Sequence, residues 1–344
     1  MGTETDPSQA FSRATITDVA RAAGVSVSTV SKVINERYGV APETTKRVMA
    51  VVTELGYETS LVASSLRNRR TNVIGILVPE FESFSVELLK GVSDAAKGTG
   101  YELLAYTGLA VGETSIGWER KSLSRLAGTL VDGAIVITPT MLIPTTSIPV
   151  VAIDPHTGQA GGSTIDSDNV GGARAACRHL IDLGHRRIAH IRGRSDLASA
   201  QLRESGYRES LTEAGIPFDL TLVRDGAYQS ALTAEAAREL LTRPDRPTAV
   251  FAANDQSALG VIRVAQELGL RVPEDVSVVG FDDIPEASTS TPPLTTVAQP
   301  LHDLGEQALL MLIERLDGHE FPRSDVHLPA ELVVRASTAP PPAG

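Results

Sequence analysis

The stretch TITDVARAAGVSVSTVSKVIN, residues 15–35, holds two short helix patterns on either side of a Gly-Val-Ser turn. Thr17 is placed to cap a first helix that begins at Asp18, because a threonine oxygen accepts backbone N–H groups and an acidic side chain is favoured at the positive end of a helix. Gly24 supplies the turn, since a residue with positive φ is often needed after a helix. The apolar face of this helix consists of Val19, Ala20 and Ala23. The sequence therefore predicts a helix, a tight turn and a second helix.

Two more helices follow the turn. Ser26 is placed to cap the second helix. Its inward-facing positions are Val30, Val33 and Ile34, and its outward-facing positions are Val27, Ser28 and Lys32. A third helix is expected from Pro42, which suits a first helical position, to Gly56, which ends it. Its apolar residues recur at helical spacing, at Val48, Val51, Val52 and Leu55. Three short helices around an aliphatic core describe a helix-turn-helix unit, although an ordinary helical hairpin has the same pattern.

The charge of the chain is divided unevenly. Residues 13–70 hold nine Lys/Arg and five Asp/Glu, a net charge of +4, whereas residues 71–344 carry −13 and the whole chain −11. A basic module on an acidic body can approach a polyanion while the body remains soluble. The charge therefore favours DNA binding over a plain helical hairpin.

Composition restricts the class of protein further. The length of 344 residues suits two or three domains. A single cysteine, Cys177, excludes an intramolecular disulfide and a multi-cysteine metal site, and it fits a reducing cytoplasm. No apolar run approaches the roughly 20 residues of a membrane helix, and no export signal opens the chain. We expect a soluble cytoplasmic protein with no membrane association and no cofactor.

The segment LGYETSLVASSLRNRRTNVIGILVP, residues 55–79, places a short Ala/Ser/Leu helix and three arginines before an Ile/Val strand. With this segment, the N-terminal part closely resembles the LacI/GalR family of bacterial repressors. The matching motifs are TDVARAAGVSVSTVSKVIN, PETTKRV, LGY, ASSLR and RRTNVIGILVP. The resemblance continues through DGAIVI, IDSDNVGG, HLIDLGHRRIAHI, RESGYRESL, AVFAANDQSALG, VPEDVSVVGFDD, PPLTTVAQP and LVVRAST. It therefore covers nearly all of residues 13–338.

The resemblance implies a set of DNA contacts. The positions that read base edges in the major groove are Val27, Ser28 and Lys32; lysine can donate to guanine, and valine can pack on a thymine methyl group. The positions suited to phosphate contacts or caps are Thr17, Ser26, Thr29, Ser31 and Asn35. The hinge positions expected at the DNA are Ser65 and Leu66. Two Leu66 side chains of a dimer would wedge into the minor groove and kink the operator.

This chain departs from the family pattern near the hinge. Thr59 and Ser60 stand where many relatives have Pro-Asn, and Ser64 replaces the hinge arginine. Ala41 stands where a serine usually caps the third helix, and an alanine cap costs roughly 1 kcal/mol relative to serine. We therefore expect the hinge helix to form less readily, which would weaken or retune operator affinity.

After residue 72 the pattern changes to strands that alternate with helices. The expected strands are VIGILVP, YELLAYT, GAIVIT, PVVAID, RIAHIRG, TAVFAAN and VSVVGFD. Such continuous apolar strands are typical of parallel sheets covered on both faces. Strands up to about residue 165, and again up to about residue 281, indicate two such lobes. A helix over Leu301–Leu316 is expected to return the chain to the first of them. The fold class is α/β: a three-helix helix-turn-helix headpiece followed, as the resemblance implies, by a two-lobed, periplasmic-binding-protein-like effector domain.

The domain boundaries follow from these patterns. Residues 1–12 are expected to be a disordered leader and residues 13–58 the DNA-binding domain. As the resemblance implies, residues 59–71 are expected to be the hinge helix and linker, and residues 72–338 the effector-binding and dimerisation domain. Crossovers between its lobes are expected near 166–170, 294–300 and 322–327. No leucine heptad follows Leu332, so we expect no C-terminal coiled coil, and residues 339–344 are interpreted as a frayed tail.

Polar residues stand where the predicted strands end. Asp154, Asn254 and Asp282 close three strands, and Arg203 stands at the start of the helix LRESGY. The resemblance implies that Arg203, Asn254 and Asp282 contact the effector. Phe84, from the loop FESFS, is suited to cover an apolar sugar face, with Trp118 as a secondary candidate. Arginine can fork onto two hydroxyls and carboxylates accept from them, so we expect a small mono- or oligosaccharide effector.

Other classes of function remain open. The same regulator class could respond to a nucleobase, a nucleoside or a sugar phosphate, and a transporter-type sugar-binding protein is a less favoured alternative. An enzyme is not expected, because the chain has no GxxxxGK[ST], HExxH or GxSxG motif. His185 and His190 are interpreted as structural residues rather than metal ligands. Asp282 and Asp283 are not expected to act as an acid–base pair, because adjacent residues at a strand end point apart.

One headpiece buries too little surface for tight specific binding, so a homodimer on a near-palindromic double-stranded DNA operator is expected. The resemblance implies that the lobes supply the dimer interface. It also implies that effector binding moves the lobes and releases the hinge segments, which requires different effector affinities in the two states.

Overall fold

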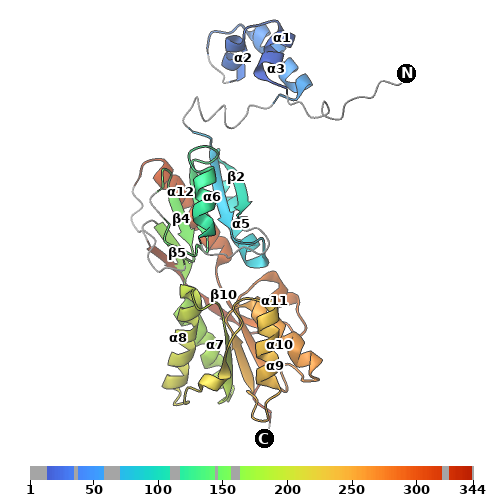
Figure 1. Cartoon of the computed structure of the whole chain (residues 1–344), viewed down its shortest axis with the longest axis vertical. Helices are drawn as coiled ribbons and strands as arrows, with labels where there is room; N and C mark the ends of the chain where they lie inside the picture. Colours follow the sequence, from blue (N-terminus) through green and yellow to red (C-terminus); the bar gives the residue numbers. More distant parts are fainter. Residues whose placement is uncertain are drawn as a thin grey trace, which may run out of the picture. The chain divides into compact units, whose positions relative to one another are not determined.

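The chain folds as two units, residues 1–69 and 70–344, and each is described by itself (Figure 1). The computed structural model describes residues 14–34, 38–57, 70–108, 117–143, 146–155, 163–319 and 325–342. The boundary between the units falls two residues before the expected start of the body at residue 72.

The first unit contains three helices, α1 (Ile16–Ala23), α2 (Val27–Ile34) and α3 (Pro42–Leu55). Thr15, not Thr17, caps α1: the Thr15 side chain accepts from the Asp18 backbone N–H, and the Asp18 carboxylate accepts from the Thr15 backbone N–H. This reciprocal capping box moves the helix start two residues upstream of the predicted one. Thr17 is therefore an exposed residue inside α1.

The turns of the first unit are those that the sequence predicts. Gly24 and Gly56 end α1 and α3 with φ of 64° and 57°, values that glycine adopts without strain. Ser26 caps α2 by accepting from the Thr29 N–H at 3.2 Å, whereas Ala41 makes no side-chain cap. The buried core is aliphatic and consists of Val19, Ala20, Ala23, Val30, Val33 and Val48. Leu55, the last of the four apolar residues at helical spacing, lies outside this core and is 39% exposed.

The second unit begins with a parallel six-stranded sheet in the order β11-β5-β4-β3-β1-β2. Its strands are β1 (Val73–Val78), β2 (Glu102–Thr107), β3 (Gly133–Ile137), β4 (Val150–Ile153), β5 (Ser163–Ser167) and β11 (Asp325–Leu328). The helices α5 (Ser83–Ala96) and α12 (Leu301–Leu316) pack together on one face, and α6 (Trp118–Leu126) covers the other. The predicted helix 301–316 is confirmed.

A second six-stranded sheet has the order β12-β10-β9-β8-β6-β7 and is parallel except for β12. Its strands are β6 (Ile188–Arg192), β7 (Val223–Asp225), β8 (Ala249–Ala252), β9 (Ser277–Asp282), β10 (Thr295–Ala298) and β12 (Glu331–Val333). The helices are α7 (Asn169–Asp182), α8 (Ala198–Glu213), η2 (Leu220–Leu222), α9 (Ser230–Leu241), α10 (Asp255–Glu267) and α11 (Pro285–Thr289). Figure 1 shows α7 and α8 on one side of this sheet and α9 and α10 on the other.

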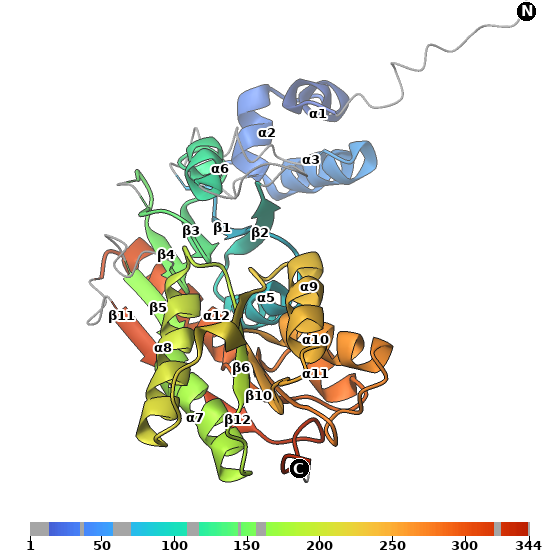
Figure 2. The same ribbon diagram turned by 60° about the horizontal axis from the view of Figure 1, so that its bottom comes forward.

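The chain passes between the two sheets three times. The first two passages, between β5 and α7 and between β10 and α12, are at the expected places. The third lies between β11, which pairs with β5, and β12, which pairs with β10 (Figure 2). The expected position near 322–327 is therefore wrong: residues 325–328 still belong to the first sheet, and the passage is at residues 329–330.

The interpretation of residues 339–344 as a frayed tail is wrong at Ala339, which is held by hydrogen bonds as Ser337 is before it. Ser337 exchanges hydrogen bonds with Val278: its hydroxyl donates to the Val278 carbonyl at 2.6 Å, and its carbonyl accepts from the Val278 N–H at 2.8 Å. The Ala339 N–H donates to Ser277 Oγ at 3.0 Å, and His185 Nε2 lies 2.9 Å from the Ala339 carbonyl. These contacts with β9 order the segment.

Candidate functional site

A cavity of about 560 Å³ lies between the two sheets of the second unit, at the carboxyl ends of their strands. Open parallel sheets bind ligands at this edge, beside the point where the strand order reverses. The order reverses between β1 and β3 in the first sheet and between β6 and β8 in the second. The volume is within the roughly 300–1,000 Å³ typical of small-molecule sites. The structure brings the five sequence-predicted effector residues to this one cavity: Phe84, Asp154, Arg203, Asn254 and Asp282.

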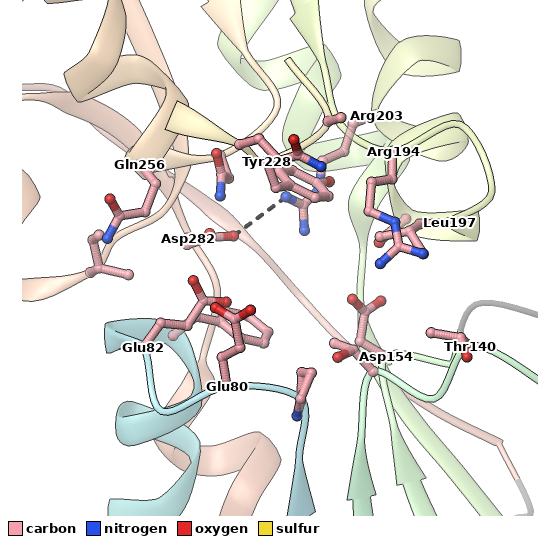
Figure 3. Close-up of a pocket in the computed structure, with 18 of the residues that line it drawn as sticks. Glu80, Glu82, Thr140, Asp154, Arg194, Leu197, Arg203, Tyr228, Gln256 and Asp282 are labelled. Atoms are coloured by element: carbon pink, nitrogen blue, oxygen red, sulfur yellow. Dashed lines mark hydrogen bonds and ion pairs between the residues drawn. The ribbon is translucent and has the colours of Figure 1, made fainter. Parts of the chain in front are cut away.

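The wall formed by the first lobe is acidic and aromatic. Glu80 and Glu82 follow β1, and Asp154 follows β4 (Figure 3). Phe84 lines the cavity from the first turn of α5 rather than from a loop, since α5 begins at Ser83. Trp118 lines it from α6, buried in the core, and its indole N–H has no hydrogen-bond partner among the described residues. Loss of solvent in the cleft, and next the charge of Glu80, raise the pKa of Glu82.

The wall formed by the second lobe holds the predicted arginine and aspartate. Arg203 lies in the second turn of α8, not at the helix start, and is 3% exposed. Its Nε donates to Asn169 Oδ1 at 2.8 Å, and its Nη1 donates to the Ala253 carbonyl at 2.5 Å. Nη1 also lies 3.4 Å from Asp282 Oδ1, and the guanidinium covers the Phe281 ring at 3.8 Å. Arg203 is thus held rigidly beside the cavity.

Asp282 is a cavity carboxylate that is strongly perturbed by its surroundings. It is 5% exposed, and burial raises its pKa to about 7 against the opposing effects of Arg203 and of the Gln299 amide. The charges of Glu82 and Asp154, from the other lobe, raise the pKa further. Its shifted pKa and its place in the cavity wall are both consistent with the predicted role of Asp282 at the effector site.

Asp282 and Asp283 point apart, as the sequence predicts. Asp283 forms an ion pair with Arg335 at 2.7 Å, and it does not line the cavity. Asp255 is buried behind Asp282 and accepts hydrogen bonds from Thr296 and from the Ile284 N–H. Burial, and next the charge of Asp282, raise the pKa of Asp255 well above its usual value.

Asn254 has a structural task in addition to lining the cavity. Its side chain caps α10 by accepting from the Ser257 N–H at 2.9 Å. This oxygen is occupied, which leaves the amide N–H₂ as the part of Asn254 that is suited to a ligand.

Arg194 and Tyr228 are among the cavity residues that the sequence reasoning missed, as are Glu80 and Glu82. Arg194 follows β6 and pairs with Asp196 through contacts of 2.6 and 3.1 Å. Tyr228 follows β7, and its ring lies against Gly193, where an added Cβ would be 2.2 Å from the ring. Burial raises the pKa of Tyr228 to about 12, so its hydroxyl stays protonated. Neither residue belongs to a motif, but Gly193 directly after a strand marks a close approach of this kind.

Backbone strain is concentrated around the cavity. Among the described residues seven that are not glycine have positive φ, and the five that line the cavity are Thr138, Asp154, Ala227, Tyr228 and Asp282. Such conformations cost about 1–3 kcal/mol each and persist where the surrounding structure enforces them, often at ligand sites. The cavity is therefore built at an energetic cost.

The positions predicted to read DNA lie on one exposed surface of α2. Val27, Ser28 and Lys32 of α2 are exposed, with Val27 at 42%. Ser26 Oγ lies 2.8 Å from Ser28 Oγ and 2.9 Å from Thr29 Oγ1, so these hydroxyls form one polar group at the start of α2. Ser31 is half-buried on the same helix. Asn35, Ser65 and Leu66, and the hinge residues Thr59, Ser60 and Ser64, lie outside the described residues.

The remaining chemical candidates are structural. Cys177 is fully buried in α7, and burial raises the pKa of its thiol. His185 contacts Thr248, Ser277 and the Ala339 carbonyl, and His190 stacks between Tyr207 and Phe251. Among the described residues, the single group with metal-ligand spacing is His302, Asp303 and Glu306 on α12, which does not line the cavity. No helix in the described part of the chain is long and apolar enough to cross a membrane.

Comparisons with known proteins match both units. Residues 15–60 match the family described as bacterial regulatory proteins, lacI family, and residues 177–338 match a periplasmic binding protein-like domain. The chain is 36% identical over 332 residues to the HTH-type transcriptional repressor PurR of Photobacterium profundum, covering 94% of this chain and 98% of that protein.

Solved structures agree with these matches. A complex of the transcriptional regulator CelR with cellobiose is 35% identical with a TM-score of 0.70, covering 94% of this chain and all of that one. A Lac repressor dimer bound to operator and an anti-inducer is 29% identical with a TM-score of 0.79, covering 95% of this chain and all of that one.

Proposed function

The chain belongs to the lacI family of bacterial regulatory proteins, and from this premise we propose that it is a transcriptional repressor whose operator binding is controlled by a small carbohydrate. One observation carries the proposal: a helix-turn-helix unit precedes a two-lobed unit whose strand ends surround a cavity of small-molecule size. The first unit supplies DNA binding and the second supplies control. We expect no catalytic activity.

DNA recognition is assigned to α2. Lys32 and Val27 are exposed on this helix, suited to a guanine edge and to a thymine methyl group respectively. The hydroxyls of Ser26 and Thr29 at the helix start are suited to phosphate oxygens, which position the helix without specifying sequence. A homodimer would place two such helices on a near-palindromic operator, with the two Leu66 side chains at its centre.

The charge of the cavity favours an uncharged polyol as the effector. Glu80, Glu82 and Asp154 line the first-lobe wall and offer acceptors for hydroxyl groups. The two arginines of the opposite wall already face carboxylates: Arg194 contacts Asp196, and Arg203 contacts Asp282. A phosphate would meet this acidic wall with no uncommitted cation among the described cavity residues to neutralise it, which disfavours a sugar phosphate. The similarity to the CelR–cellobiose complex supports a saccharide.

A nucleobase or nucleoside is the second candidate. Phe84 and Tyr228 line the cavity from opposite lobes and offer two aromatic faces, and Asp282 offers an acceptor for ring N–H groups. A transporter-type binding protein is a weaker alternative, because it would not explain the basic helix-turn-helix unit.

Ligand control requires that the effector bind two arrangements of the lobes with different affinities. Arg203 and Asp282 lie on the second lobe, whereas Glu82 and Asp154 lie on the first, so a ligand that contacts both walls changes the balance between arrangements. The hinge segment, residues 59–71, would respond by ordering or unfolding its helix on DNA.

Two measurements on the full chain test the proposal. A gel shift on the DNA upstream of the chain's own gene should show specific binding that a scrambled duplex does not compete away. A thermal-shift panel of neutral sugars, sugar phosphates and nucleobases should identify the effector, with Trp118, the one tryptophan of the sequence, as a fluorescence reporter in the cavity wall. Absence of specific DNA binding would exclude the repressor, and a response to nucleobases alone would exclude the saccharide.

A further inference from the structure

Five residues form a closed ring of hydrogen bonds, here named the crossover ring, in which four links join side chains and one runs through the Ser167 backbone carbonyl. Gln299 Nε2 donates to Asp282 Oδ1 at 2.6 Å, and Ser167 Oγ donates to Gln299 Oε1 at 2.5 Å. Asn169 Nδ2 donates to the Ser167 carbonyl at 3.1 Å. Arg203 closes the ring, because its Nε donates to Asn169 Oδ1 at 2.8 Å and its Nη1 lies 3.4 Å from Asp282 Oδ1.

The crossover ring joins the cavity to the passages between the lobes. Ser167 ends β5 of the first sheet, and Asn169 opens α7 of the second lobe. Gln299 lies between β10 and α12, in the second passage. Asp282 and Arg203 line the cavity. Asp282 in the cavity wall is therefore one hydrogen bond away from the second passage, through Gln299, and two away from Ser167 at the first.

Every member of the ring is shielded from water. The side chains of all five residues are between 3% and 7% exposed. A buried polar group that loses its partner is destabilised, and groups in one buried network respond together. The ring therefore favours discrete arrangements over gradual distortion: if Asp282 turns toward a ligand, Gln299 must follow or lose its acceptor.

We propose that Gln299 and Ser167 are positioning residues that couple the state of the cavity to the angle between the lobes. The inference rests on the proposed function, in which the cavity holds the effector. Asp282 Oδ1 accepts from Gln299 and Arg203, which leaves Oδ2 for a ligand donor. A donor at Oδ2 draws the carboxylate into the cavity, and the Gln299 amide transfers that displacement to Ser167 across the passage between the lobes.

The proposal predicts thermodynamic coupling between the two ends of the ring. Asp282→Asn alters the cavity end without changing the shape of the side chain. Ser167→Ala opens the ring at the far end, and it removes a hydroxyl that does not line the cavity. If the ring transmits the change, the effect of Asp282→Asn on the lobes must depend on Ser167.

The angle between the lobes is measured in the full chain by double electron–electron resonance. Spin labels on Ser93→Cys in α5 and Glu235→Cys in α9 report one site on each lobe, and the native Cys177 is buried. An excess of unlabelled chain removes distances between protomers. Ser210→Ala is the matched control, because Ser210 is a buried serine whose hydroxyl donates within α8, to the Gly206 carbonyl.

Asp282→Asn should shift the interlobe distance distribution, and this shift gives the change in the equilibrium constant between the two arrangements of the lobes. With Ser167→Ala, that change should become about five-fold smaller, the factor in an equilibrium constant that corresponds to one buried hydrogen bond. The shift should persist with Ser210→Ala. Gln299→Met, which removes both of its hydrogen bonds at similar volume, should act like Ser167→Ala and replaces it if that variant does not fold.

Three results would overturn the proposal: an equal shift in every background, no shift in any, or a loss of the shift with Ser210→Ala as well. Operator binding by the unsubstituted chain is measured in the same preparation. A failure there contradicts the repressor function, whereas the distance measurement still decides the role of the ring.

Discussion

Replacing Asp282 by asparagine should stabilise the protein while weakening its effector response. Burial raises the pKa of this carboxyl from 3.8 to about 7, a difference that corresponds to roughly 4 kcal/mol. Asparagine has the shape of the protonated carboxyl and can still accept from Gln299 Nε2, so the cost of ionising a buried group disappears. This difference already includes the favourable charge of Arg203, which opposes the rise of the pKa. We expect a net gain in the free energy of unfolding of about 2–4 kcal/mol at pH 8.

The sign of the pH dependence follows from the direction of the shift. Near pH 4 the carboxyl of the parent is largely protonated in the folded state and about half protonated in the unfolded state, so the two proteins should differ little. As the pH rises toward 7, Asp282 ionises in the unfolded chain before it ionises in the folded one, and the parent loses stability relative to the variant. Above pH 7 the difference should level off.

Urea unfolding at several pH values between 4 and 8 measures this difference. Asp283→Asn is the matched control: Asp283 is paired with Arg335, so the same substitution should bring no gain. Effector binding should weaken about 10–100-fold in Asp282→Asn, the loss expected for one charge-assisted hydrogen bond. A variant that is less stable than the parent at pH 8, or a difference that does not change with pH, would refute the reasoning.

Four further predictions concern the headpiece, the hinge and the cavity. Lys32→Ala should reduce discrimination against non-specific DNA by roughly 1–3 kcal/mol in a titration at fixed salt, and an unchanged specificity ratio would remove Lys32 from the base-reading set. Arg203→Lys keeps a charge but cannot reach Asn169, the Ala253 carbonyl and Asp282 together. Operator binding should therefore persist in a gel shift, whereas the effector should no longer release the protein from DNA. Normal release of the DNA by the effector would contradict this. Ala41→Ser should stabilise the headpiece by about 0.5–2 kcal/mol in thermal unfolding, because the α3 cap has no side-chain bond, and no gain would show that serine does not cap there. Leu66→Ala should reduce DNA bending and operator affinity in a circular-permutation assay, and an equal bend angle would exclude a wedge.

Much of the fold could be predicted because its signals are local. The glycines that end α1 and α3, the serine cap of α2 and the bounds of α12 each depend on residues within one or two turns. The error at Thr17 was a choice between two neighbouring threonines, decided by the reciprocal bond between Thr15 and Asp18. The strand-end acids were found because parallel strands bring their carboxyl ends to one edge.

The parts that could not be predicted depend on contacts between distant residues. Tyr228 and Arg194 lie in loops without periodicity, and only the close approach of Tyr228 to Gly193 places its ring in the cavity. Gln299 has no motif, and its importance appears once it bonds to Ser167 and Asp282. The ordered segment around Ser337 consists of small residues and prolines that resemble a free end, yet β9 supplies its partners.

Control of DNA binding from the cavity is the central claim, and one titration tests it most directly. Fluorescence anisotropy of a labelled duplex from upstream of the chain's own gene is recorded with and without the compound that shifts Trp118 fluorescence. The account predicts specific binding and a change in the operator dissociation constant of about five-fold or more when the compound is added. Five-fold is the lower end of typical allosteric coupling. In Arg203→Lys, the compound should leave the operator dissociation constant unchanged. A compound that binds the cavity but leaves the operator dissociation constant unaltered would contradict it.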